Sequence, residues 1–151
     1  MDASSDRDAA IQIRCPATNH HTPIVRAVAA AIALGADFDI DALADTRLAV
    51  DEACSTLIRR AAREATMIAT FRPDGARVRV RIEVCPERDH PLDQETFGWQ
   101  VLSALVRDVT TGVEDAGADH GASPGAGRTM FIQFTAVSDP AGQKIHVKPA
   151  V

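Results

Sequence analysis

Residues 48–58, which read LAVDEACSTLI, limit the fold of this chain more than any other segment. Apolar side chains recur there at helical spacing, three or four residues apart: Val50, Cys54, Leu57 and Ala61. The pattern predicts a helix with one buried stripe. Glu52 and Thr56 lie on a neighbouring face, about one helical turn from each other. An acid and a hydroxyl at the edge of a buried stripe can face a ligand, although a solvated polar face explains this helix alone more simply.

The composition is that of a soluble globular protein. The chain has 151 residues, of which 46% are hydrophobic and 25% charged, enough for one domain with a substantial core. The formal net charge of −5 argues against binding nucleic acid through a general basic field. Aromatic residues make up only 4% of the chain, which argues against a platform for stacking bases. We therefore expect no direct contact with nucleic acid.

We expect a cytoplasmic protein without a membrane span. No apolar run is long enough to cross a bilayer, and the first ten residues, MDASSDRDAA, lack the regions of a signal peptide. The cysteines Cys15, Cys54 and Cys85 do not have the spacing of a disulfide framework or a zinc motif. We expect them to behave as small buried hydrophobes, and a thiol-sensing role is the alternative.

The predicted elements follow the order β-α-α-β-β-α-β-β. Strands are expected at residues 10–15, 66–72, 77–85 and 129–135, with no range assigned to the remaining strand, and helices at residues 22–35, 39–63 and 97–108. Thr22 is the expected N-cap of the first helix, and Asp39 or Asp41 that of the second. Residues 86–96 should form a loop, and residues 115–128 a mobile one.

This order predicts a single α/β domain. Residues 9–137 should form it, between a disordered N-terminus at residues 1–8 and a flexible tail at residues 138–151. The helices should cover one face of a mixed, mostly antiparallel sheet, which gives a two-layer sandwich.

In this setting, LAVDEACSTLI resembles the first conserved box of the RsbW-like proteins, the anti-sigma-factor and serine-kinase branch of the GHKL ATPase superfamily. That box reads roughly V-x-E-A-x-x-N-A-I. The resemblance implies the Bergerat ATPase fold over about residues 9–137, with ATP and magnesium as cofactors. It implies that Glu52 is the catalytic carboxylate, which acts as general base or orients the attacking group. Thr56 stands where the family has the asparagine that holds magnesium, and a threonine hydroxyl can also ligate this ion.

The other nucleotide boxes of the family are only partly kept. Residues 86–93, PERDHPLD, stand where a D-x-G-x-G box reads adenine, and they contain no glycine. Asp89 or Asp93 is the candidate replacement for its carboxylate. Gly98 resembles the glycine that lets helix amides meet a phosphate, and Gly127 and Thr129 resemble a G-T-T-like turn. The resemblance therefore makes Thr56 and these last three residues the candidate cofactor-binding residues of an eroded site.

The resemblance implies an anti-sigma factor. Such a protein binds a stress or sporulation-type sigma factor, represses transcription, and is released by an anti-anti-sigma factor. The first helix around Arg26 and the segment leading into the second helix are candidate contact surfaces. One alternative is an active ATP-dependent kinase that phosphorylates a serine or threonine of the anti-anti-sigma factor, and another is the thiol-sensing regulator. Family members usually dimerise through their sheets, so a homodimer is also implied.

Overall fold

The computed structural model describes residues 9–116 and 127–139, and there the chain follows the predicted order of elements. They are β1 (Ile11–Pro16), α1 (Thr22–Gly35), α2 (Ile40–Ile58), β2 (Thr66–Asp74), β3 (Arg77–Val84), α3 (Phe97–Leu105), β4 (Arg107–Asp115) and β5 (Arg128–Val137). The predicted disordered N-terminus, most of the predicted tail and most of the 115–128 loop lie outside the described residues. Ser138, at the start of that tail, is buried and bonds the Asp39 carboxylate at 3.0 Å.

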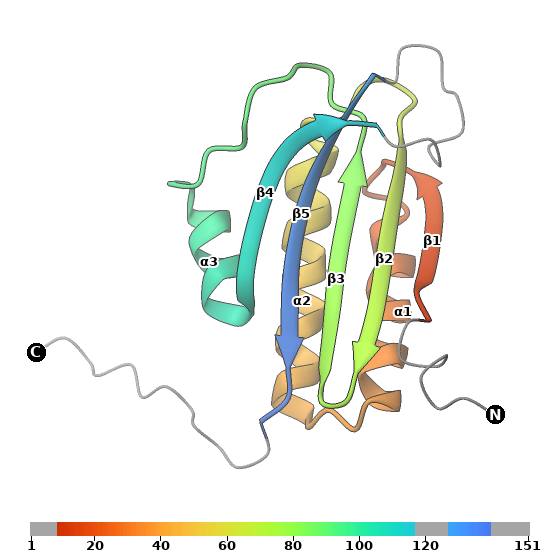
Figure 1. Cartoon of the computed structure of the whole chain (residues 1–151), viewed down its shortest axis with the longest axis vertical. Coiled ribbons are helices and arrows are strands. Elements are labelled where there is room, and N and C mark those ends of the chain that lie inside the picture. The colour runs from red at the N-terminus through yellow and green to blue at the C-terminus, as the bar shows by residue number, and fades with distance from the viewer. Residues whose placement is uncertain (1–8, 117–126, 140–151) are drawn as a thin grey trace, which may run out of the picture.

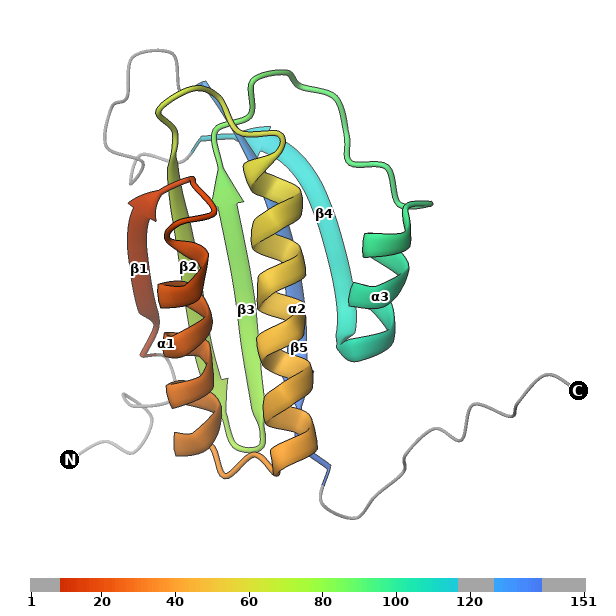
Figure 2. The same cartoon turned by 180° about the vertical axis from the view of Figure 1, so that it is seen from behind.

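The five strands form one sheet in the order β1-β2-β3-β5-β4. All neighbouring strands in it are antiparallel, so the sheet is fully antiparallel, whereas the prediction was a mixed, mostly antiparallel sheet. The helices lie on one face of the sheet, and the opposite face is left uncovered by them (Figures 1 and 2). The two-layer α/β sandwich is therefore confirmed. In this arrangement β1 and β4 are the edge strands.

The core lies between the helices and the inner face of the sheet. On β3 the apolar residues Val78, Val80, Ile82 and Val84 face this core, while arginines alternate with them on the other face. The turn between β2 and β3 uses Gly75, whose φ of +59° suits glycine. Alternation along β3 thus determines which face of the sheet is polar.

The helix predicted from residues 48–58 is confirmed. Its buried stripe consists of Ala49, Val50, Ala53, Cys54 and Leu57, all fully buried. Asp39 caps the helix, because its side chain accepts a hydrogen bond of 2.9 Å from the Ala42 amide. Its small alanines let α2 lie close over β3 and β5, at the centre of the helical layer.

The prediction of a helix over residues 97–108 was too long. The helix ends at Leu105, and residues from Arg107 onward pair with β5 as strand β4. Val106 has an extended backbone, with a φ of −137° and a ψ of 177°, which ends the helical path. Asp108 then has a φ of +54° at an irregularity in the register of β4. The β-branched residues that follow, among them Val109 and Val113, favour an extended backbone. Leu102 is nevertheless buried, as the helical spacing predicts.

Two helix boundaries also differ from the prediction. Helix α2 ends at Ile58 and not near Arg63, because the Ala62 amide bonds the Cys85 carbonyl at 2.9 Å and so joins the end of β3. At the other boundary, His21 takes the N-cap position and Thr22 is the first residue of α1. Thr22 therefore does not cap this helix, and its buried hydroxyl has no hydrogen-bond partner among residues 9–116 and 127–139.

Candidate functional site

Glu52 and Gly98 meet where α2 packs against α3. A side chain at Gly98 would collide with Glu52, because an ideal Cβ there would lie 3.1 Å from the carboxyl carbon and closer still to Oε1. Gly98 follows Phe97 at the start of α3, whose N-cap Thr96 accepts a 3.2 Å hydrogen bond from the Trp99 amide. The carboxylate thus lies at the positive end of the helix dipole. Two residues predicted for the nucleotide site are therefore neighbours.

The surroundings of Thr56 do not suit a magnesium ion. Nη2 of Arg59 donates a 3.4 Å hydrogen bond to the Thr56 hydroxyl, which places a cation beside the predicted metal ligand. Magnesium in proteins takes oxygen ligands that usually include one or two carboxylates. Across the described ranges 9–116 and 127–139, no group of three histidine, cysteine or acidic residues is arranged to hold a metal. The residues present around Thr56 do not fit the ion that the family resemblance implies.

The segment between β3 and α3 is fixed by bonds to the end of α2. The Glu87 amide donates to the Arg60 carbonyl at 2.8 Å, and the Arg60 side chain donates to the His90 carbonyl. Both candidate adenine-reading acids already have local partners. Asp89 lies 3.7 Å from the Arg128 guanidinium, and Asp93 accepts a 2.8 Å hydrogen bond from the Glu95 amide. Each carboxylate would have to leave its partner to read a base.

Gly127 and Thr129 lie at the start of β5. Gly127 is exposed, and nothing lies within 4 Å of the position of a Cβ there. Thr129 is buried and pairs with Glu114 across the β4–β5 ladder. In the described part of the chain, no hydrogen bond or ion pair joins either residue to Glu52 or Thr56. The structure therefore places Gly98 beside Glu52, but it does not link Gly127 or Thr129 to Glu52 or Thr56.

A second polar group lies between α1 and α2, and it includes a residue that sequence reasoning missed. Nη1 of Arg26 forms a 2.8 Å ion pair with Oδ1 of Asp51. Both side chains are about one third exposed, at 34% and 38%. They line a hollow of about 410 Å³ whose wall also includes Ser55 and Arg59. Asp51 precedes Glu52 in the first box. In the sequence, only its four-residue spacing to Ser55 indicates that the two side chains share one face of the helix.

Of the three cysteines, Cys54 has the properties of a buried hydrophobe, while Cys15 and Cys85 are only partly buried. Cys54 is fully buried, and burial raises the pKa of its thiol to about 12. Burial also raises the pKa of Cys15. Both thiols are therefore protonated at neutral pH, whereas the reactive form of cysteine is the thiolate. All three cysteines are free in the structure, and nothing at Cys15 or Cys54 favours a thiol sensor.

Comparison with known proteins finds relatives that are named anti-sigma factors. Over 102 residues the chain is 35% identical to the anti-sigma-F factor RsbW of Mycobacterium tuberculosis, in both strain CDC 1551 and strain H37Rv. The match covers 68% of this chain and 61% of each relative, so the chain spans less than two thirds of their length. No protein-family model matches the sequence. None of the helices in the described residues has the length and apolar character needed to cross a bilayer.

Proposed function

We propose that this chain is an RsbW-like anti-sigma factor of the GHKL superfamily, which binds a sigma factor and so represses transcription. The observation that carries the proposal is its 35% identity to proteins named anti-sigma-F factor. The two-layer sandwich and the contact between Glu52 and Gly98 agree with the family resemblance of the first box. A sigma factor works with RNA polymerase, so the proposal also places the protein in the cytoplasm, with a role in the response to stress.

The helical layer offers a surface that suits a basic sigma factor. Ile40 and Leu34 are large apolar residues that are 81% and 60% exposed near the junction of α1 and α2. Acidic residues surround this junction: Asp37, Asp39, Asp41 and Asp45. An apolar anchor with a rim of one charge is a common form of protein-binding surface. Its negative charge complements a DNA-binding protein, and the Arg26–Asp51 pair lies on the same helical layer.

The test is calorimetric titration of the protein with a candidate stress-type sigma factor, together with transcription by polymerase carrying that sigma factor. We expect tight binding and repression by the wild type, and at least tenfold weaker binding by Ile40→Asp. The matched control is Phe97→Asp, since Phe97 is also 81% exposed but lies on α3. Absence of sigma binding by the wild type would refute the function, and equal loss in both variants would refute the surface.

We propose that sigma binding does not require phosphoryl transfer. Glu52 beside the start of α3 favours the kinase alternative, because a base near helix amides suits phosphate chemistry. The Arg59 guanidinium at Thr56 and the lack of glycine in residues 86–93 disfavour it. Thermal melts with ATP and magnesium will distinguish an anti-sigma factor that acts by binding alone from an active kinase. We expect no change in melting temperature, and a clear rise would favour the kinase that modifies an anti-anti-sigma factor.

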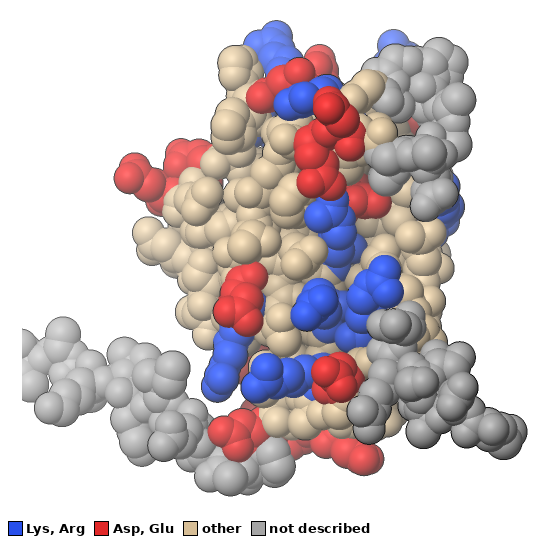
Figure 3. Space-filling view, in the orientation of Figure 1, with Lys and Arg blue, Asp and Glu red and all other residues tan. Residues whose placement is uncertain are grey.

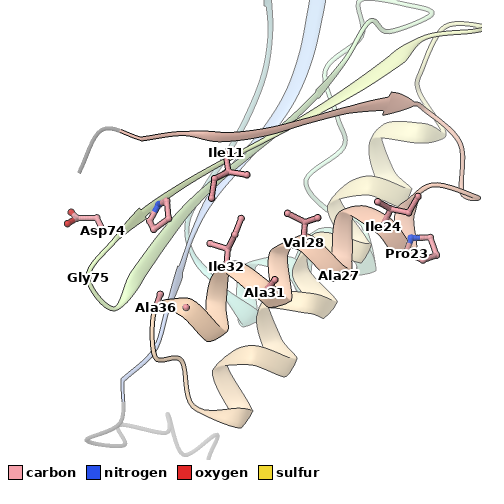
Figure 4. Close-up of a pocket in the computed structure, with 12 residues that line it drawn as sticks. Ile11, Pro23, Ile24, Ala27, Val28, Ala31, Ile32, Ala36, Asp74 and Gly75 are labelled. Atoms are coloured by element: carbon pink, nitrogen blue, oxygen red, sulfur yellow. The ribbon is translucent and has the colours of Figure 1, made fainter. Parts of the chain in front are cut away.

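We propose a homodimer formed along the β1 edge. A groove of about 1370 Å³ runs between β1, α1 and the β2–β3 turn. Figure 4 shows Ile11 pointing from β1 towards Val28 and Ile32 of α1. Because β1 is an edge strand beside this apolar groove, a second copy can extend the sheet there and cover the groove.

An anti-anti-sigma factor that releases the sigma factor remains part of the proposal.

Sedimentation of the purified protein tests the dimer. Ile24 lines the groove and is 53% exposed, so Ile24→Glu should give a monomer. Leu48 is similarly exposed on α2, outside the residues that line this groove, and Leu48→Glu should stay dimeric. A monomeric wild type, or a dimeric Ile24→Glu variant, would contradict this interface.

A further inference from the structure

The uncovered face of the sheet carries a cluster of arginines that the proposed function does not use. They come from three neighbouring strands: Arg14 of β1, Arg72 of β2, and Arg79 and Arg81 of β3. Figure 3 looks onto this face and shows basic side chains gathered over the middle and lower part of the sheet, with acidic ones above them. The chain as a whole has a net charge of −5, so this cluster is a local reversal of sign.

Arg72 and Arg79 are the unusual members of the cluster. They are direct partners in the β2–β3 register, and both are exposed. Like charges at directly opposed positions destabilise a sheet. Within residues 9–116 and 127–139, neither guanidinium forms an ion pair or a side-chain hydrogen bond. The fold therefore holds two unneutralised cations side by side, which an anion from another molecule would stabilise.

The arginines surround a hollow that can accept a carboxylate. It has a volume of about 230 Å³, and its wall includes the amide side chains of Gln12 and Gln133 and the carboxylate of Glu83, which pairs with Arg81. Ile68 lies in the wall as well and is almost completely buried. Guanidinium groups bind carboxylates through two parallel hydrogen bonds, and side-chain amides can add further donors. A small, donor-rich hollow of this kind suits one or two acidic side chains.

We propose that this arginine face binds an extended acidic segment of a partner protein, whose carboxylates enter the hollow between Arg72 and Arg79. Charge complementarity supports this occupant. A second copy presenting the same face is disfavoured, because a twofold contact would place arginines against arginines. The site lies on the layer opposite α1 and α2, so it does not depend on the proposed sigma-binding surface.

A nucleic acid fits this face less well than an acidic peptide. Binding of single strands relies on exposed aromatic rings for base stacking. Phe131 is the aromatic residue of this face among the described residues, and the Arg81 guanidinium already covers its ring at 4.0 Å from the centroid. Arg81 is itself neutralised by Glu83 at 2.8 Å and by Glu114. Glu114 bounds the basic cluster on the side towards β4, whereas Glu83 lines the hollow itself, so the part that suits a partner is the end at Arg72 and Arg79.

The test is fluorescence anisotropy with a labelled peptide of ten glutamates, at low and at physiological salt. We expect the wild type to bind, and Arg72→Gln/Arg79→Gln to bind at least tenfold more weakly. The control Arg47→Gln/Arg63→Gln removes the same charge from exposed residues outside the sheet and should bind like the wild type. Removing two opposed cations should not unfold the sheet, and a thermal melt of each variant verifies this.

Three results would overturn the proposal. The first is no binding of the glutamate peptide by the wild type at low salt, and the second is equal binding by the wild type and the Arg72→Gln/Arg79→Gln variant. The third is tighter binding of a single-stranded oligothymidylate of the same charge, which would assign the face to a nucleic acid. A peptide of ten lysines serves as the negative probe and should not bind this face.

Discussion

The buried thiol of Cys54 makes the stability of the protein sensitive to alkaline pH. Burial, with smaller contributions from Cys15 and Asp51, raises its pKa from 9.0 to about 12. The unfolded thiol ionises near the ordinary value while the folded thiol stays protonated. The stabilising contribution is therefore complete below about pH 9 and is lost as the pH rises towards 12.

Urea unfolding at pH 8 and at pH 10.5 measures this contribution. We expect the free energy of unfolding of the wild type to fall by about 1.4 kcal/mol per pH unit above the ordinary thiol pKa through this group alone. Cys54→Ala should be less stable at pH 8 because it leaves a small cavity, but it should lose less stability at high pH. Identical pH dependences for the two proteins would show that Cys54 ionises normally in the folded state.

The contact between Glu52 and Gly98 predicts that substitutions at the two positions are not additive. Alanine in place of a helical glycine stabilises by about 0.5–1 kcal/mol, since it restricts the unfolded chain. In the wild type, a Cβ at position 98 would displace the Glu52 carboxylate and offset this gain. We expect Gly98→Ala to stabilise the Glu52→Ala variant but not the wild type. Additive changes in the free energy of unfolding would mean that the carboxylate moves aside freely.

At the scale of elements, α2 holds the domain together through one stripe. Val50 is fully buried in that stripe, whereas Leu48, two residues earlier, is about half exposed. Val50→Asp places an unpaired carboxylate in the core, and its cost of several kcal/mol approaches the whole stability of a small domain. We expect this variant to be unfolded by circular dichroism at 25 °C and Leu48→Asp to be folded. A folded Val50→Asp protein would refute the register of α2.

Sequence patterns predicted elements well where one period dominates. The stripe of α2 and the alternation of β3 repeat long enough to reveal both the element and its buried face. The segment after Leu105 shows why other boundaries were missed. Val101, Leu102, Leu105 and Val109 keep helical spacing across the junction, but only the pairing of Arg107 and later residues with β5 makes β4 a strand. That pairing joins residues far apart in the chain, which local spacing does not report.

The candidate functional site was likewise predicted only in part from the sequence. Helical spacing placed Glu52 and Thr56 on one side of α2, and the family resemblance indicated Gly98. The guanidinium at Thr56 and the ion pair of Asp51 with Arg26 were not predicted. Both depend on how long side chains orient after the helices pack, and a cation three residues from a hydroxyl has no distinctive sequence pattern. The alternating arginines of β3 are visible in the sequence, but only their register with β2 and β1 shows the cluster.

At the scale of the whole molecule, the two layers carry opposite charges on their outer surfaces. Acidic residues surround the junction of α1 and α2, while arginines gather on the uncovered sheet face. A basic partner and an acidic partner can therefore bind on opposite sides without sharing residues. The two surfaces face opposite sides of the sandwich (Figures 1 and 2), and both lie towards the end of the molecule where Ser138 bonds Asp39 and Ala76. Direct competition between the two partners is not expected from this geometry.

Titration of the glutamate peptide into the protein already saturated with sigma factor tests this independence. We expect the dissociation constant of the peptide to change less than twofold, because the two surfaces face opposite sides of the sandwich and share no residue. The Ile40→Asp variant should bind the peptide like the wild type, and Arg72→Gln/Arg79→Gln should bind the sigma factor like the wild type. Displacement of the peptide by the sigma factor would refute the independence of the two surfaces.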